Sequence, residues 1–442
     1  MFKTTGERGG IRVLAYCAFA GVVAFAAGQW HFAASLSETR CGGKTAYVLV
    51  GFDRVPGAEE RAVIEAHGGE VLKSFWIAPA ICALVPVASF SALESHPAVR
   101  YLEADASVSA PGMDSPPTAS VTPARSWGAL RVGSGGAAIA GWETGAGVAV
   151  LDGGIDASHP ALNVMTQGTT TNHYFDNPFR SHLEDNYGGG AHVAGIIAGH
   201  GEGAAGIAPN ARLYSVRVLA NGFGSHATVV AGIQWAIEHD VPIIHMGFTS
   251  YAGAGRTLQK ACDAAYDAGH LLIAPAGTRY PGMRGRTPSR TMLAAAMDDN
   301  AGRGPAERLW DTVAHPARYK SVIAVTGSGA DDNVWKYSAV GPDVELIAPA
   351  EDVPSTLRGG GYGSVATRPA TASAHVAGAA ALIWAANPDL TNDEVRAILH
   401  ETAEDLGLHE WKQGHGLVRA DRAAAAATQR NVTNTAAASA SW

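Results

Sequence analysis

The sequence has few basic residues, few charges of either sign and no apolar run of transmembrane length. Lysine and arginine number 32 against 40 acidic residues, which gives a formal net charge of −8 without a basic stripe. This balance argues against a nucleic-acid partner. Charged residues make up 16% and hydrophobic residues 47% of the 442 residues, as is typical of a globular protein with a large core. The length allows two or three domains.

An apolar run near the N-terminus, from Val13 to Gly28, is shorter than the about 20 residues that a bilayer span requires. Basic residues precede it and small residues follow it, which is the order of a secretory signal peptide. We therefore expect a signal peptide within residues 1–34 and a secreted or periplasmic location. An uncleaved anchor is the alternative, and only then would the chain contact a membrane. The flanking residues are Lys3, Arg8, Arg12, Ala33 and Ala34.

Cysteine is scarce, with four in the whole chain, of which Cys17 would leave with the signal peptide. The three that stay, Cys41, Cys82 and Cys262, are an odd number and define no disulfide framework. A Cys41–Cys82 pair stays open. Cys262 lies in a helical stretch, where we expect it to act as a small buried hydrophobe.

Residues 46–110 have the pattern of a compact α+β unit. Runs of β-branched and aromatic residues predict its strands, and Gly68-Gly69 suits the end of its first helix. The residues that follow, 111–124, are rich in proline and are expected to form a linker. The predicted strands are 47–50, 71–75, 80–85 and 99–105, and the predicted helices are 60–67 and 90–96.

From residue 125 to 426, apolar β-runs alternate with helical patterns. This alternation predicts an α/β fold whose mostly parallel sheet is covered by helices on both faces. A capping box from Thr391 to Glu394 opens one of the helices. The alanine-rich residues 427–442 are expected to form a flexible tail. The predicted strands are 148–151, 211–219, 242–246, 271–274, 321–325 and 344–348, and a predicted helix is 225–239.

Two segments end in the same His-Val-Ala-Gly sequence. They are Gly189-Gly190-Ala191-His192-Val193-Ala194-Gly195 and Ala370-Thr371-Ala372-Ser373-Ala374-His375-Val376-Ala377-Gly378. Each resembles a catalytic helix start of the subtilisin-like serine proteases (subtilases), written His-Gly-Thr-His-Val-Ala-Gly and Gly-Thr-Ser-Met-Ala-x-Pro-His-Val-Ala-Gly. The resemblance implies a subtilisin-like three-layer fold for residues 125–426. It also implies that residues 46–110, with Val-x-Tyr-x-Glu-x-Asp at 99–105, are a ferredoxin-like, inhibitor-type propeptide domain.

The resemblance places the catalytic groups of the family onto this chain. The acid is kept as Asp152, although Gly153 follows it where the family has Ser or Thr. The position of the general base is Gly189, and that of the nucleophile is Ala370. The oxyanion position, Asn in the family, is Thr278. Substrate-cleft positions fall on Gly222, Gly224, Gly247, Phe248 and Thr249, and Phe248 is expected to narrow the cleft.

A serine hydrolase needs a base that takes the proton of a nucleophile, and glycine and alanine can do neither. His192 and Ser373 lie one helical turn beyond the missing groups and are candidates for a relocated centre, although the family already keeps both as scaffold residues. His182, Glu184 and Asp185 could swing towards Asp152, but a solvated loop is favoured. A shift of the alignment brings Thr371 or Pro369 to the nucleophile position, yet no histidine lies within two residues of Gly189.

These substitutions predict a pseudoprotease that binds extended peptides or a partner in the former substrate cleft. Its own propeptide would stay attached, with residues 104–110 in the cleft like a bound product. The alternatives are a serine endopeptidase with a relocated centre and a chain with no function beyond folding. No cofactor is expected, and no metal, because the family's calcium segment has only Glu202 as a carboxylate. The basic insertion 279–311, with Arg284, Arg286, Arg290 and Arg303, is either a solvated loop or a docking site.

Overall fold

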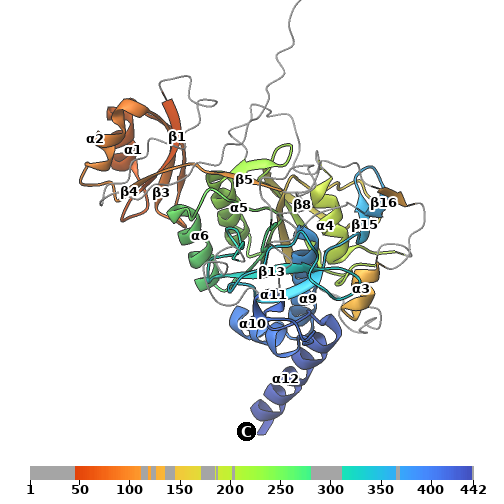
Figure 1. The fold of residues 1–442 in the computed structure, drawn as a ribbon. Coiled ribbons are helices and arrows are strands. Elements are labelled where there is room, and N and C mark those ends of the chain that lie inside the picture. Colours follow the sequence, from red (N-terminus) through yellow and green to blue (C-terminus); the bar gives the residue numbers. More distant parts are fainter. Residues whose placement is uncertain are drawn as a thin grey trace, which may run out of the picture.

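The computed structural model describes residues 45–110, 118–120, 126–134, 145–170, 185, 188–201, 205–279, 311–364 and 369–440. Its centre is a seven-stranded parallel sheet in the order β14-β13-β12-β11-β7-β9-β8 (Figure 1). The expected parallel α/β fold is confirmed. The strands are β7 (Gly147–Asp152), β8 (Val164–Thr170), β9 (Arg212–Arg217), β11 (Ile243–Met246), β12 (Leu271–Pro275), β13 (Val322–Ser328) and β14 (Leu346–Pro349).

Helices cover both faces of this sheet, and the strand sequences show why. Successive side chains of a strand point to opposite faces. In β7, Val148 and Val150 pack in one apolar cluster, and Ala149 and Leu151 pack in another. The first cluster includes residues of helices α4 (Gly189–Ala198) and α9 (Pro369–Ala386), and the second includes residues of α5 (His226–Glu238) and α6 (Arg256–Asp267). A strand buried on both faces reads as a continuous apolar run, which is the signal that located it in the sequence.

The remaining elements of this region lie around the sheet. Helix α10 (Asn392–Glu401) begins at the predicted capping box, in which the Glu394 amide donates to the Thr391 hydroxyl at 3.2 Å. Residues Thr118–Ser120, expected in a linker, form strand β6, which pairs with β16 (Gly361–Ser364) beside β15 (Pro354–Leu357). Other short helices are α3 (Trp127–Arg131) and α11 (Glu410–Gln413).

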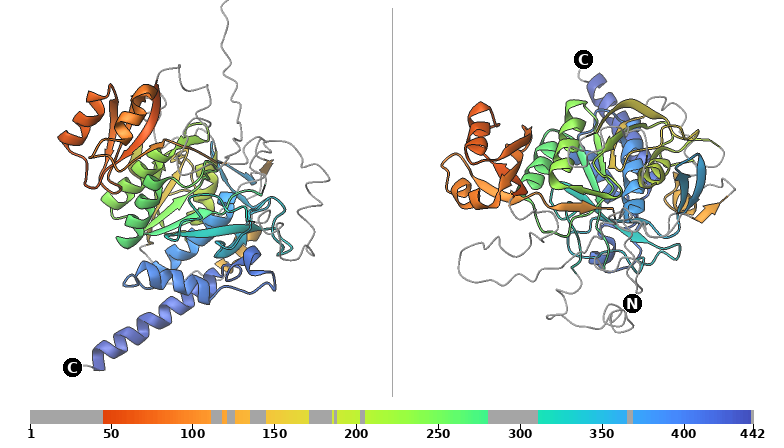
Figure 2. Two further views of the ribbon diagram at one scale, coloured as in Figure 1. Left: turned by 60° about the vertical axis from the view of Figure 1, so that its left-hand side comes forward. Right: turned by 90° about the horizontal axis from the view of Figure 1, so that it is seen from above.

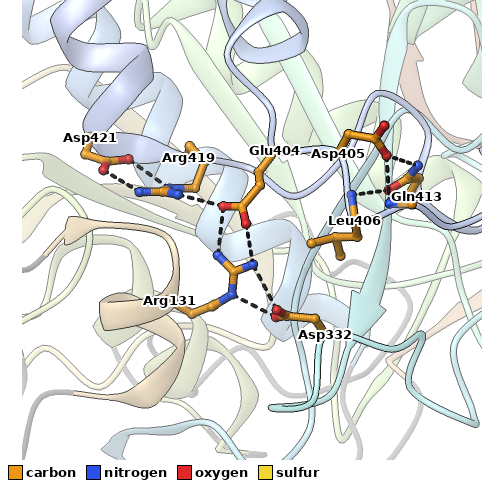
Figure 3. A network of polar contacts seen from close by, with 9 residues as sticks. Arg131, Asp332, Glu404, Asp405, Leu406, Gln413, Arg419 and Asp421 are labelled. Atoms are coloured by element: carbon orange, nitrogen blue, oxygen red, sulfur yellow. Dashed lines mark hydrogen bonds and ion pairs between the residues drawn. The ribbon is translucent and has the colours of Figure 1, made fainter.

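Residues 427–440, which fall within the expected tail 427–442, belong to helix α12 (Ala420–Ala440) (Figures 1 and 2). Alanine has the highest helix propensity of the residues, so an alanine-rich segment favours continuation of a helix. A chain of ion pairs connects the start of this helix to α3 (Figure 3). Arg131 binds both Asp332 and Glu404, and Arg419 binds Glu404 and Asp421.

Residues 45–104 form a separate antiparallel sheet in the order β2-β3-β1-β4, with helices α1 (Ala58–Ala66) and α2 (Phe90–Glu94) on one face. Residues 45–110 are called the N-terminal unit below. Figure 2 shows the sheet of this unit beside α5 and α6 of the larger region. The other face of its sheet shares an apolar cluster with α5, through residues such as Leu49 and Phe75. The strands are β1 (Thr45–Gly51), β2 (Glu70–Phe75), β3 (Ala80–Pro86) and β4 (Tyr101–Ala104), and a 3-10 turn spans Val87–Ser89.

Both described cysteines are buried. Cys82 lies in β3, and Cys262 lies in α6, where burial raises the pKa of its thiol, as expected of a small core residue. The proposed partner Cys41 and the signal segment 1–34 lie outside the described residues. Within the part of the chain that is described, no helix is both long and apolar enough to cross a membrane.

Candidate functional site

Asp152 ends β7, at the carboxyl edge of the parallel sheet, where α/β folds place their sites. The side chain is fully buried, and its Oδ1 accepts a hydrogen bond from the Gly153 amide at 2.7 Å. Gly247, just after the neighbouring strand β11, has no side chain, and a Cβ there would overlap Asp152 Oδ2. The carboxylate therefore occupies space that any larger residue at position 247 would take.

Gly189, the predicted position of the general base, is the first residue of α4 and is buried. The next residue, Gly190, packs so closely against the turn after β7 that a Cβ would overlap the Gly154 carbonyl oxygen. This contact brings the start of the helix against the Asp152 strand, and a Cβ at 190 would lie 3.6 Å from the Asp152 Cβ. The acid and the empty base position thus lie together.

Asp185 has a role that the sequence analysis missed. Its carboxylate accepts hydrogen bonds from the amides of Gly188 and Ala191, both at 2.7 Å, and the residue is 4% exposed. A buried carboxylate at the N-terminus of a helix satisfies free amides and is stabilised by the helix dipole. The expectation of a solvated loop charge is therefore wrong at Asp185, while His182 and Glu184 lie outside the described residues.

Ala370, the predicted position of the nucleophile, lies in the first turn of α9 and is 2% exposed. Ser373, one turn further, donates to the Ala370 carbonyl at 3.1 Å, and its Oγ lies 2.8 Å from His245 Nε2. Because the hydroxyl has a single proton, His245 is the donor in this pair. His192 Nε2 lies 3.0 Å from the Val353 carbonyl oxygen. Ser373, His245 and His192 are all completely buried. The contacts of Ser373 and His192, the two candidates for a relocated centre, therefore connect elements of secondary structure.

The oxyanion position is altered in chemistry and in surroundings. The Thr278 amide donates to the Tyr251 hydroxyl at 2.7 Å, and the Thr278 hydroxyl lies 3.0 Å from the same oxygen. At the predicted oxyanion position, the Tyr251 side chain therefore contacts both the amide and the hydroxyl of Thr278. Tyr251 itself is 41% exposed, so this end of the site faces solvent.

Residues 107–110 lie between the two segments that are predicted to line the substrate cleft. Strand β5 (Ser107–Ser109) pairs antiparallel with β10 (Phe223–Ser225), with Val108 opposite Gly224. On its other side Ser109 exchanges two hydrogen bonds with Thr249, both 2.9 Å long. The Ala110 amide donates to the Gly222 carbonyl at 3.0 Å. Residues 107–110 thus pair through their backbone with both predicted cleft segments.

Side chains of residues 103–108 also contact the larger region. Val108 and Phe248 are completely buried in one apolar cluster. Ahead of them, Asp105 Oδ1 accepts from the Ala227 amide at 2.8 Å, in the first turn of α5. Glu103 does the same for α6, with 2.8 Å to the Arg256 amide and 2.9 Å to the Thr257 amide. Two carboxylates of the N-terminal unit therefore cap two helices of the larger region.

Two further residues contact the seated segment and were not found from the sequence. Ser250 Oγ donates to the Ser107 carbonyl at 3.0 Å, and His226 Nε2 lies 3.2 Å from the same Oγ. Burial is the main reason that the pKa of His226 falls to about 4. Their partner lies more than a hundred residues away in sequence, so no local pattern indicates this contact.

Metal ligands do not gather in the described part of the chain, where no group of three His, Cys, Asp or Glu side chains could hold an ion. Residues 202–204 of the presumed calcium segment are outside that part, as is almost all of the basic insertion 279–311.

Comparisons with known proteins agree with this geometry. A sequence model described as "Subtilase family" matches residues 143–435. Subtilisin NAT of Bacillus subtilis subsp. natto is 32% identical over 385 residues, which cover 85% of this chain and 90% of the relative. The thermostable alkaline protease of Halalkalibacterium halodurans is 34% identical over 367 residues, or 82% and 88% of the two chains. Alkaline elastase YaB of a Bacillus species is 31% identical over 408 residues, or 89% and 94%.

Proposed function

The chain belongs to the subtilase family, and we propose that it is a member without peptidase activity, which binds extended peptide segments in the former substrate cleft. One observation carries the proposal. The base and nucleophile positions are Gly189 and Ala370, both buried at the starts of the helices that present the catalytic groups in the family. Asp152 remains at the end of β7, close to the start of the helix that begins at Gly189.

The chemistry that is left supports binding rather than hydrolysis. Removal of the nucleophile and base leaves at most a residual acceleration of about 10³–10⁴ over water from binding and oxyanion stabilisation. Here the Thr278 amide and hydroxyl already contact Tyr251, which competes with an oxyanion for the same donors. In contrast, the backbone groups that pair with an extended chain are in use, at Gly222 and Thr249. Recognition by strand addition needs only these groups and a pocket for alternate side chains.

A peptidase with a relocated centre is the second candidate, and the Ser373–His245 pair at 2.8 Å is the observation that favours it. Both side chains are 0% exposed, which denies a peptide carbonyl access to the Ser373 hydroxyl. Burial of the pair therefore makes binding the better supported function.

We further propose that residues 45–110 act as a propeptide that the chain cannot remove. The strand 107–110 in the cleft and the caps from Glu103 and Asp105 support this role. The match to subtilisin NAT also covers 85% of the chain, more than residues 143–442 contain. The segment would have to leave its place before another peptide could bind there. The basic residues and apolar run at the N-terminus support export before this stage, which N-terminal sequencing of the exported protein tests.

The central experiment compares hydrolysis and binding on one preparation. The purified full chain is incubated with a panel of fluorogenic peptides and with a fluorophosphonate probe, and an active subtilase serves as the positive control. We expect neither hydrolysis nor labelling, and the mass of the chain should not change on storage. Peptide binding is then measured by fluorescence anisotropy after a foreign protease has cut the 111–117 segment. Labelling of Ser373 would establish the relocated centre instead, and absence of binding to the opened protein would refute the binding function.

A further inference from the structure

A chain of two hydrogen bonds connects the side chain of His226, through Ser250, to the backbone of residues 107–110. Nε2 of His226 lies 3.2 Å from Oγ of Ser250, and that hydroxyl donates to the Ser107 carbonyl at 3.0 Å. The backbone of His226 also takes part, because its amide donates to the Ala106 carbonyl at 2.9 Å. Both side chains are 1% exposed. The start of α5 therefore binds the segment through a main-chain and a side-chain contact.

The single proton of the Ser250 hydroxyl decides the state of the histidine. That proton goes to the Ser107 carbonyl, so His226 Nε2 carries a hydrogen and donates to Oγ. In the neutral ring Nδ1 is then a bare acceptor. Nδ1 is buried without a hydrogen-bond partner and packs against Gly255, where a Cβ would overlap it. A proton on Nδ1 would create a buried imidazolium with no acceptor on that side.

Among the described groups, none raises the pKa of His226, and burial and His315 both lower it. His315 is close enough that its own charge lowers the pKa of His226, and Tyr319 binds the backbone of Gly255 through its hydroxyl. The carboxylate of Asp105 is used by the Ala227 amide. Glu103, further along the same segment, is used by the start of α6.

We propose that His226 and Ser250 form a clasp that holds residues 107–110 in the cleft while His226 is neutral and releases them in acid. The inference rests on the proposed function, since it makes the opening of the peptide-binding cleft dependent on pH. Once residues 107–110 are released, an external peptide can compete with them for the same backbone groups. An acidic compartment or medium would then open the cleft without proteolysis.

The direction follows from linkage. An ordinary histidine has a pKa of 6.5, and that of His226 in the closed state is lowered to about 4 by burial. Between these values, an open state in which water reaches the ring of His226 binds the proton that the closed state refuses. The contribution to closure is complete above pH 6.5 and is lost as the pH falls towards 4.

Hydrogen exchange of the full chain tests the clasp. The Ser109 and Ala110 amides donate to Thr249 and Gly222, so their protection, corrected for the intrinsic pH dependence of exchange, reports closure. We expect opening of residues 105–110 to rise about tenfold for each pH unit below 6.5, as linkage to one proton requires. His226→Gln keeps a neutral side-chain donor and should abolish this slope. His239→Gln, at an exposed histidine that ends the same helix, should behave as the wild type.

A second variant covers the case in which His226→Gln disturbs folding, which circular dichroism would reveal. Ser250→Ala removes the link to Ser107 and should raise exchange of residues 105–110 about fivefold at pH 7.5, the effect of one hydrogen bond. No pH slope in the wild type, an unchanged slope in folded His226→Gln, or no effect of Ser250→Ala would each overturn the clasp. The exchange measurement uses no peptide, so it tests the clasp even if the protein binds no external peptide.

Discussion

The Ser373 hydroxyl lies 2.8 Å from His245 Nε2 in the interior of the protein, where neither residue has any exposed surface. The pair connects the first turns of α9 to strand β11, next to the strand that ends in Asp152. A serine and a histidine at this distance could be mistaken for a nucleophile and its base. Their burial makes the pair a structural tie between the helix and the sheet.

Ser373→Ala should therefore reduce stability and leave peptide hydrolysis at its background level. Loss of a buried hydrogen bond that leaves a partner unsatisfied costs about 1–3 kcal/mol. The free energy of unfolding from urea titrations measures this cost. Ser364→Ala, at a half-buried serine in β16, is the matched control and should change stability by less. A hydrolytic activity that disappears in Ser373→Ala would contradict this assignment.

Restoring the lost groups should restore activity in steps. The double variant Gly189→His, Ala370→Ser supplies a base beside Asp152 and a hydroxyl at the start of α9. We expect slow cleavage in the 111–117 segment, seen as loss of the N-terminal unit by mass spectrometry. Each single variant is the control and should stay uncut, because nucleophile and base act as a unit.

The oxyanion position should then limit the rate of the restored enzyme. Loss of one oxyanion donor costs about 10²–10³-fold in kcat, so adding Thr278→Asn to the double variant should increase kcat by up to this factor. Tyr251→Phe, which frees the Thr278 amide, should give a smaller increase. If Thr278→Asn leaves kcat unchanged, the alignment of this position with the family's asparagine is wrong.

Much of the fold was readable in the sequence because burial on both faces makes a strand such as β7 a continuous apolar run. The positions of Asp152, Gly189 and Ala370 followed from motifs that start helices or end strands. The sequence could not show that Asp185 caps α4, because a loop carboxylate looks the same whether it is solvated or buried. It could not show His226 and Ser250 either, since their partner Ser107 is brought to them by the docking of a separate unit. The alanine-rich composition of residues 427–442 favours a helix by propensity, and residues up to 440 belong to α12.

The caps from the N-terminal unit should be measurable by charge removal. Glu103→Gln and Asp105→Asn weaken hydrogen bonds from helix N-termini to a carboxylate, each worth about 1 kcal/mol. Both variants should increase the rate at which a foreign protease removes residues 45–110, and the double variant more so. Glu94→Gln, at an exposed position of α2, should have no effect. Equal rates in all four proteins would show that the caps do not secure the unit.

Acid should destabilise the larger region through His375. Its Nδ1 lies 2.8 Å from the Thr371 carbonyl oxygen, while Nε2 is buried without a partner and faces Gly128. Burial lowers the pKa of His375 from 6.5 to about 4. The unfolded chain thus binds a proton that the folded chain refuses, and stability falls as the pH drops below 6.5.

The pH dependence of the unfolding free energy tests this role of His375. His375→Asn keeps a donor near the position of Nδ1 and should remove about 1.4 kcal/mol per pH unit from the decline of unfolding free energy between pH 6.5 and 4. His226 contributes a similar slope, so part of the decline should persist. His239→Asn, at an exposed site, should leave the decline as it is. If the unfolding free energy of His375→Asn declined with pH in parallel with that of the wild type, this histidine would be excluded as a source of acid sensitivity.

The ion pairs in Figure 3 should stabilise the contact between α3 and the chain leading into α12. Glu404 lies at the centre, bound by Arg131 at 3.0 Å and by Arg419 at 2.6 Å. The hydrogen bond from Arg131 is the main cause that lowers the pKa of Glu404 from 4.5 to about 2. Stability from this carboxylate is present above pH 4.5 and is lost as the pH falls towards 2.

Glu404→Gln should cost about 1–2 kcal/mol of unfolding free energy at pH 7, since hydrogen bonds to charged groups are worth about 1.5–3 kcal/mol and partial exposure reduces the gain. Glu401→Gln breaks only the exposed pair with Arg430 and should cost less than about 1 kcal/mol. Urea titrations at pH 7 and pH 3 compare the two variants with the wild type. The Glu404→Gln deficit should shrink at pH 3, where the wild-type carboxylate has lost part of its advantage. A deficit that is the same at both values would mean that packing, and not the charge of Glu404, holds α3 in place.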